Sequence, residues 1–315
     1  MADRRFGLGF QRTYHQGHLT LGVGVPLETY SSPVPTMHDP VPRIRAVDSG
    51  GFAALWCRDV PLLDPSFGDG GQLYDPFVWL GYVAAHTERV ALGTGSIILP
   101  LRNPIDLAKA AASVDRLTEG RLILGVASGD RPVEYGVYEV PFEPRGERFR
   151  AVLPVLRAAT HRPSGWEDTH AAHSHRVELL PKSHAGDIPL IVTGHSRQPL
   201  AWIAEHGDGW LTYPRPIAQQ ATAFAQWQRA LEDTESPWKP FSQSLYIDLC
   251  RDPDTPPSPI HLGYRLGLAA LLKHLDGLRR IGVNHVAFNL RFSSEPIDWV
   301  LETLATQVVP EFPSG

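Results

Sequence analysis

Residues 92–135 read LGTGSIILPLRNPIDLAKAAASVDRLTEGRLILGVASGDRPVEY, and they carry the clearest signal of the fold. Apolar, β-branched runs at 89–99 and 121–128 flank a segment with helical spacing at 104–117. Asn103 followed by Pro104 is typical of a helix start, and Gly120 is typical of a helix end. The stretch therefore predicts a strand, a helix and a second strand parallel to the first.

The same alternation extends through the chain, so we expect eight strands and eight helices. The expected strands are Leu19–Pro26, Ala53–Val60, Arg89–Leu99, Arg121–Ser128, Ile188–Gly194, Gly209–Tyr213, Ser244–Cys250 and His285–Phe292. The expected helices are Val41–Ser49, Pro76–His86, Pro104–Leu117, Arg145–Ala159, Pro199–Glu205, Ile217–Glu232, Tyr264–Arg280 and Pro296–Val309. Runs such as IPLIVTG (188–194) are almost continuously apolar, as in parallel strands buried on both faces. The prediction is an α/β protein, a single (β/α)8 TIM barrel over residues 1–315, with loop excursions at its C-terminal mouth. An open doubly wound sheet is the alternative, and only the strand count argues against it.

Two tracts break the alternation, and we expect both to be loops. The first, 161–187, is rich in His, Ser and Gly, and the second, 251–260, carries four prolines and is expected at the barrel mouth. His170, His173 and His175 lie in the first tract, where no strand or helix fixes them. Because metal sites need preorganised ligands, we expect a solvated loop and no metal site there.

Composition narrows the class of partner. The net charge is -5 and the pI is near 6.3, so the chain lacks the basic footprint of a nucleic-acid-binding protein. Two cysteines far apart indicate neither a disulfide framework nor a zinc site. No apolar stretch is long enough for a membrane span, and the N-terminus is polar. We expect a cytoplasmic protein that acts on a small molecule.

In a β/α barrel the chemistry lies in the loops after the strands, which selects three polar clusters. They are Arg58 and Asp59, then Ser128, Gly129, Asp130 and Arg131, then Gly194, His195, Ser196, Arg197 and Gln198. The last cluster is the best candidate for an anion site. Gly194 permits a tight turn, the backbone N–H groups after it can donate, and a helix is expected to follow from Pro199. The alternative is an ordinary turn without a ligand; a serine nucleophile at Ser196 is disfavoured because Gln198 replaces the second glycine of that motif.

Glycines inside the third expected strand mark a further candidate surface. Gly93, Thr94, Gly95 and Ser96 form a small-residue run, and such glycines often allow close approach of a ligand. A flat ring could rest there, whereas a simple packing role is the alternative. The run is no dinucleotide fingerprint, because it lacks a third glycine and lies within a strand.

These segments also resemble a known family, the luciferase-like flavin monooxygenases. The similarity is strongest in residues 92–135 and extends to GGFAALWCRDVPL (50–62), IPLIVTGHSRQPLAWIAEHGDGW (188–210) and VNHVAFNL (283–290). The resemblance implies that Thr94 and Gly95 lie under the flavin ring, joined by a non-proline cis peptide. It also implies that the cofactor phosphate contacts residues 128–131 and 194–198.

The resemblance further implies a flavin-dependent oxidoreductase, a monooxygenase that uses reduced FMN and oxygen on a small organic substrate. An NAD(P)H:flavin reductase would supply the reduced FMN, and a homodimer is expected. Luciferases carry a histidine after the second strand, but this chain has Arg58 and Asp59 there, which makes light emission doubtful. These two residues are the candidates for substrate orientation or acid/base work, or else form a structural ion pair at the rim. Hydride transfer with the deazaflavin coenzyme (F-420) and a non-catalytic flavin-binding role are the alternative functions.

Overall fold

Eight parallel strands close into a barrel in the computed structural model, which describes residues 5–67, 73–161 and 178–315. They are β1 (Thr20–Gly24), β2 (Ala54–Cys57), β3 (Ala91–Thr94), β5 (Leu122–Ala127), β6 (Leu190–Thr193), β7 (Gly209–Thr212), β8 (Phe241–Leu249) and β11 (His285–Asn289). The barrel closes because β11 pairs in parallel with both β8 and β1. The predicted TIM barrel is confirmed.

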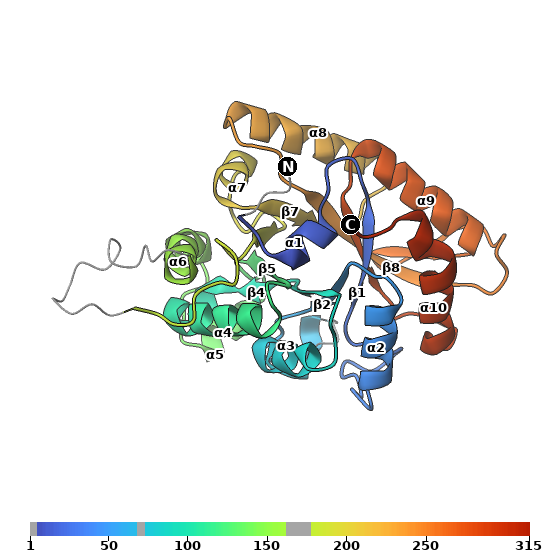
Figure 1. Cartoon of the computed structure of the whole chain (residues 1–315), viewed down its shortest axis with the longest axis horizontal. Coiled ribbons are helices and arrows are strands. Elements are labelled where there is room, and N and C mark those ends of the chain that lie inside the picture. Colours follow the sequence, from blue (N-terminus) through green and yellow to red (C-terminus); the bar gives the residue numbers. More distant parts are fainter. Residues whose placement is uncertain (1–4, 68–72, 162–177) are drawn as a thin grey trace.

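The helices form an outer ring around the strands (Figure 1). They are α2 (Val41–Ser49), α3 (Pro76–Ala84), α4 (Pro104–Leu117), α5 (Pro132–Val137), α6 (Arg145–Thr160), α7 (Leu200–His206), α8 (Ile217–Asp233), α9 (Leu268–Ile281) and α10 (Ile297–Thr303). The helix α4 has the predicted bounds, because Asn103 Oδ1 accepts from the backbone N–H of Ile105 at 2.9 Å and caps its first turn. Among the described residues, no helix is long and apolar enough to cross a membrane.

Side-chain alternation along the strands separates two apolar layers. The larger layer packs the strands against the helices, and the smaller one fills the lumen with Trp56, Ala91, Ile123 and Leu211. A short helix that the sequence analysis missed, α1 (Leu8–Thr13), lies across the centre of the barrel in Figure 1 and contacts β3 and β5. The N-terminal segment therefore plugs one end of the lumen and leaves the other end for ligands.

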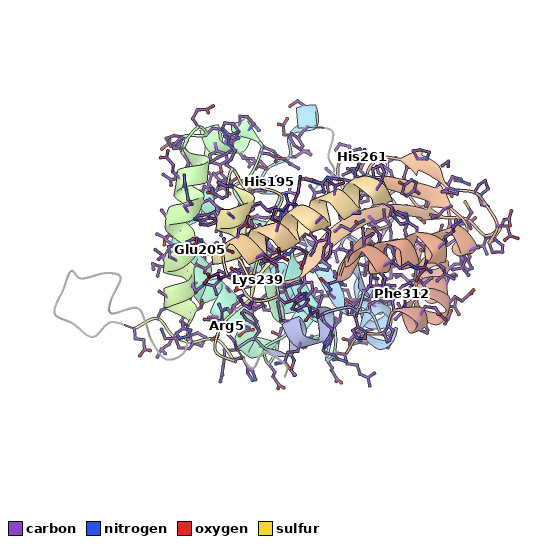
Figure 2. The ribbon with its side chains drawn as sticks, turned by 90° about the horizontal axis from the view of Figure 1, so that it is seen from above. Arg5, His195, Glu205, Lys239, His261 and Phe312 are labelled. Atoms are coloured by element: carbon purple, nitrogen blue, oxygen red, sulfur yellow. The ribbon has the colours of Figure 1, made fainter. Side chains whose placement is uncertain are left out.

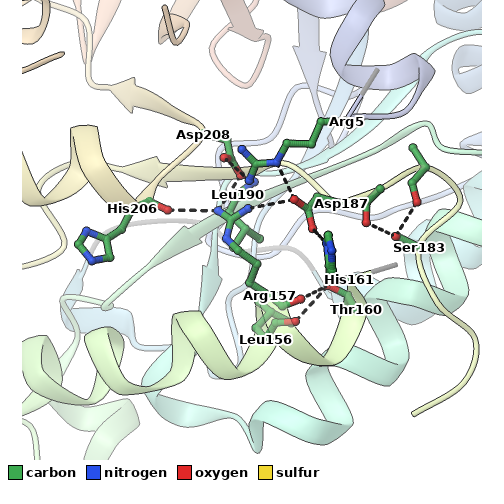
Figure 3. Close-up of polar contacts among 12 residues, drawn as sticks. Arg5, Leu156, Arg157, Thr160, His161, Ser183, Asp187, Leu190, His206 and Asp208 are labelled. Carbon is green, nitrogen blue, oxygen red and sulfur yellow. Dashed lines mark hydrogen bonds and ion pairs between the residues drawn. The ribbon is translucent and has the colours of Figure 1, made fainter. Parts of the chain in front are cut away.

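An ion-pair cluster fastens this segment to the N-terminal ends of the strands (Figure 3). Arg5 bridges Asp187 at 2.6 Å and Asp208 at 3.2 Å, the two carboxylates that precede β6 and β7. Arg157 of α6 also contacts Asp208, at 2.8 Å, and His161 contacts Asp187. Arg5 lies on the opposite side of the molecule from His195 in Figure 2, so this clamp is remote from the mouth.

One polar chain crosses the lumen between β2, β11 and β1. Trp56 Nε1 donates to His285 Nε2 at 2.9 Å, so the ring proton lies on Nδ1 and faces the Thr20 hydroxyl at 2.8 Å. That hydroxyl donates in turn to the Thr13 carbonyl oxygen at 2.7 Å. Complete burial lowers the pKa of His285 to about 3, so the imidazole is neutral. The chain fixes the position of the Trp56 indole in the lumen.

The third expected strand, Arg89–Leu99, was predicted too long. It divides into β3 and a two-residue strand, β4 (Ile97–Ile98), which pairs with β5. The expected non-proline cis peptide is present, but it joins Gly95 to Ser96, one bond after the position expected at Thr94 and Gly95. The sequence pattern could not show the break between β3 and β4, because apolar residues lie on both sides of it.

The segment between β8 and α9 differs from its prediction. The helix expected at Tyr264–Arg280 begins only at Leu268, because Tyr264 belongs to β10 (Gly263–Leu266). This strand pairs with β9 (Ser258–Ile260) and with the upper part of β8, so the tract 251–260 includes part of a hairpin. It is an excursion next to the C-terminal end of β8, as predicted. The histidines His170, His173 and His175 lie outside the described residues.

Candidate functional site

Three small residues lie at the open end of the lumen, near the Trp56 indole. Gly24 and Ala127 are inward-facing positions of β1 and β5, Gly95 follows β3, and the Trp56 indole of β2 is 4% exposed. A Cβ on Gly93 would lie 2.4 Å from the Trp56 ring, whereas one on Gly95 would lie 3.8 Å away. Gly93 therefore admits the indole, and Gly95 leaves space above it. A flat ring system fits this floor.

The side chains of Thr94 and Ser96 make different contacts around the lumen. Thr94 lies on the strand face that points to the helices, is fully buried, and donates from its hydroxyl to the Gly125 carbonyl oxygen at 2.8 Å. Only its backbone can therefore face the lumen. The Ser96 hydroxyl, which the sequence analysis named only within the glycine run, donates to the Thr193 hydroxyl and joins the ends of β3 and β6.

The loop after β6 has the geometry of an anion site. Gly194, Ser196 and Arg197 have φ values of 55°, 46° and 61°, which turns successive backbone N–H groups in a tight arc. Among the described residues, none accepts a hydrogen bond from the backbone N–H of His195, Ser196 or Arg197. A Cβ on Gly194 would meet nothing within 4 Å. The helix α7 that follows has only seven residues, so anion binding here depends on the loop donors.

Side chains hold this loop in place. The Ser196 hydroxyl donates to the Thr193 carbonyl oxygen at 2.9 Å and accepts from the Ser128 N–H at 3.3 Å. Gln198 is buried and donates to the Gly146 carbonyl oxygen at 2.8 Å. Trp210 Nε1 donates to the Gly194 carbonyl oxygen at 2.7 Å, and its indole lies edge-on to the exposed His195 ring. Ser128 and Ser196 thus bring the two predicted phosphate loops together.

The loop after β5 adds a cation and a buried acid. Gly129 has a φ of 72°, Asp130 is exposed, and Arg131 is 5% exposed with its guanidinium 4.3 Å from the Phe67 ring centroid. Arg131 Nη1 lies 3.7 Å from the carboxylate of Glu134, which is completely buried. Burial raises the pKa of Glu134 to about 7, and the positive charge of Arg131 only partly offsets this. Glu134 lies on α5, a helix that the sequence analysis missed.

Arg58 and Asp59 lie at the mouth but face different surroundings. Asp59 is buried, and its carboxylate accepts from Arg102 Nη2 at 2.8 Å, Arg102 Nε at 3.1 Å and the Ile98 N–H at 3.1 Å. Asp59 therefore forms an ion pair at the rim with Arg102, whereas the alternative considered from the sequence was a structural ion pair of Arg58 and Asp59. Arg58 is half-buried and follows the inward-facing Trp56 in the alternation. The roles assigned to these two residues stay predictions.

The fold defines the class of protein, a β/α barrel, and characterised enzymes of this class have their sites at the C-terminal mouth. The chain matches the luciferase-like monooxygenase family over residues 16–249. It belongs to that family, which confirms the resemblance seen in the sequence.

Individual relatives agree with this assignment. The oxygenase component of a flavin-dependent trigonelline monooxygenase from Acinetobacter baylyi is 28% identical over 159 residues, 50% of this chain and 40% of the relative. Two solved structures share the fold. The oxygenating constituent of 3,6-diketocamphane monooxygenase from Pseudomonas putida, in complex with FMN, has a TM-score of 0.72 at 12% identity and covers 95% of this chain and 100% of its own. An F420-dependent secondary alcohol dehydrogenase has a TM-score of 0.74 at 16% identity and covers 94% of this chain and 99% of its own.

Proposed function

We propose that this protein is a flavin-dependent monooxygenase that uses reduced FMN and oxygen to oxidise a small organic substrate. The observation that carries the proposal is the cluster of backbone N–H donors at residues 195–197, which lies in the tight loop after β6 at the same end of the barrel as the small residues beside Trp56. Residues 128–131 adjoin this cluster, because the Ser128 N–H donates to the Ser196 hydroxyl. The membership of the luciferase-like monooxygenase family and the names of the relatives support the same chemistry.

Each group has a distinct part in this proposal. The backbone N–H groups of His195, Ser196 and Arg197, together with the guanidinium of Arg131, would hold the phosphate of FMN. Gly95 and Trp56 would support the isoalloxazine ring, which supplies the redox chemistry when bound. The barrel contributes a rigid floor and excludes water from one face of that ring. Arg58 would orient the substrate from the rim.

Two further roles belong to partners. The relative described as an oxygenase component supports a separate reductase that delivers reduced FMN to this chain. A homodimeric state and a cytoplasmic location stay predictions.

The second candidate function is hydride transfer with the deazaflavin coenzyme. The F420-dependent neighbour motivates it, because a deazaflavin also carries a phosphate and a flat ring system. A non-catalytic flavin-binding protein is the third candidate.

Parallel titrations separate these functions. Purified protein is titrated anaerobically with reduced FMN, oxidised FMN and the deazaflavin coenzyme, and binding is followed by calorimetry. The monooxygenase predicts that reduced FMN binds most tightly of the three. Preference for the deazaflavin would establish the second candidate, and binding of none of them would refute the proposal. Oxygen uptake in the presence of reduced FMN and a substrate collection then distinguishes an enzyme from a binding protein.

A further inference from the structure

Three aromatic rings meet at the mouth of the barrel outside the apolar core. They belong to Tyr246 of β8, His261 in the turn between β9 and β10, and Phe292 in the loop after β11. The ring centroids of Tyr246 and Phe292 are 5.5 Å apart, and His261 stands edge-on to both, at 5.8 Å and 6.2 Å. We call these three residues the aromatic wall.

The aromatic wall faces the ligand end of the lumen. Phe241, Leu245 and Ile247 of β8 pack against the helices, so the intervening Tyr246 points inward, where it pairs in register with the inward-facing Asn289 of β11. Figure 2 shows His261 on the same side of the molecule as His195 of the anion loop. The wall therefore lies at the same end of the barrel as the proposed flavin site and not in the packing layer.

Exposure distinguishes the wall from core aromatics. Large rings such as Trp210, Trp227 and Phe288 are buried between strands and helices, whereas Phe292 is 37% exposed and His261 is exposed. Tyr246, at 9% exposed, belongs to none of the apolar clusters found among the described residues. Apolar ring surface that remains open at a catalytic mouth is the usual lining of a ligand site.

A positive charge borders this surface. The guanidinium carbon of Arg291 lies 5.3 Å from the Phe292 ring centroid and 4.7 Å from that of Tyr30. Arg291 follows β11 and Arg58 follows β2, and these two strands flank β1 on either side. A guanidinium has five N–H donors, so it can stack on rings and also bind a carboxylate through paired donors.

We propose that the aromatic wall and Arg291 form the substrate subsite, and that the substrate is an aromatic carboxylate. Its ring packs against Phe292 and Tyr246, and its carboxylate contacts Arg291. This inference rests on the proposed monooxygenase function for its meaning, but the binding it describes can be measured without flavin.

The probes are benzoate, benzamide and cyclohexanecarboxylate, which share size but differ in charge or in the ring. Binding to the full chain is measured by calorimetry with and without FMN. Cyclohexanecarboxylate loses the aromatic ring contacts and benzamide loses the charged contact with Arg291, so benzoate is expected to bind about five- to tenfold more tightly than either analogue. Equal binding of benzoate and cyclohexanecarboxylate, or of benzoate and benzamide, would overturn the proposed substrate class.

Variants test the location. Phe292→Ala is expected to weaken benzoate binding about five- to tenfold and to change FMN affinity less than about twofold. Arg291→Ala is expected to abolish the preference for benzoate over benzamide, and Arg291→Lys to restore part of it. The matched control is Tyr82→Ala, an exposed aromatic on the outer helix α3. Unchanged benzoate binding in both site variants would overturn the subsite. If the unaltered protein does not bind FMN, the proposed function is refuted. The benzoate titration would still test the subsite, because it is also measured without FMN.

Discussion

A negative charge placed at Gly194 should weaken phosphate binding without altering the shape of the loop at residues 194–198. At a φ of 55°, Asn and Asp are the side chains that fit the backbone best, and a Cβ at this position meets nothing within 4 Å. Gly194→Asp and Gly194→Asn therefore differ in charge and hardly in shape. A carboxylate about 5 Å from a phosphate with roughly two negative charges is repelled by about 1–2 kcal/mol even at a dielectric constant of about 80. This predicts FMN binding about tenfold weaker in the Asp variant than in the Asn variant.

The assay is calorimetric titration of both variants with FMN, at low and high salt, with riboflavin as the ligand that lacks a phosphate. The difference between the variants should shrink at high salt, because ions screen the repulsion. It should vanish for riboflavin. Equal FMN affinity in the two variants, or the same difference with riboflavin, would refute the assignment of the phosphate to this loop.

Three further predictions concern the walls of the site. Asp59→Asn breaks the partly buried ion pair with Arg102, so urea titrations should give a free energy of unfolding that is lower by about 1–3 kcal/mol. A variant that is fully stable but inactive would instead establish that Asp59 does acid/base work. Because the folded-state pKa of Glu134 is raised to about 7, its ionisation destabilises the fold as pH rises from about 4.5 to about 7, by roughly 1.4 kcal/mol per pH unit. Glu134→Gln should therefore be more stable than the unaltered protein at pH 8 and not at pH 4.5, and identical pH profiles would contradict the burial argument. Gly93→Ala places a Cβ 2.4 Å from the Trp56 ring, and the resulting overpacking should destabilise the fold by about 1–3 kcal/mol. Calorimetry should therefore show a lower melting temperature, and an unchanged one would contradict the close contact.

The barrel could be predicted because its signals are local. The Asn103 cap and the alternation of apolar runs with helical segments fix the helix α4 and its flanking strands before any long-range contact is considered. The hairpin of β9 and β10 could not be predicted in the same way. Tyr264 fits a helical pattern, and its pairing with Ile247 of β8 and Pro259 of β9 makes it a strand residue.

The loops of the candidate site could be predicted from the sequence, but the contacts between its side chains could not. The rule that barrel chemistry follows the strands selected residues 128–131 and 194–198, and the structure brings them together through Ser128 and Ser196. The pairing of Asp59 with Arg102 is a contact between residues 43 positions apart, and no local pattern encodes it. The burial of Glu134 could not be inferred either, because a glutamate is rarely buried completely and no local pattern marks this one. The inward position of Trp56 was available from strand alternation, since Ala54 and Arg58 share its face.

Hydrogen–deuterium exchange with and without reduced FMN, under anaerobic conditions, tests the placement of the cofactor at the C-terminal mouth, with its phosphate between two loops. Peptides that contain residues 128–131 and 194–198 should exchange more slowly when reduced FMN is bound, while those around Arg5 and α1 should not change. Protection confined to other segments, or no protection at either loop under saturating reduced FMN, would contradict it.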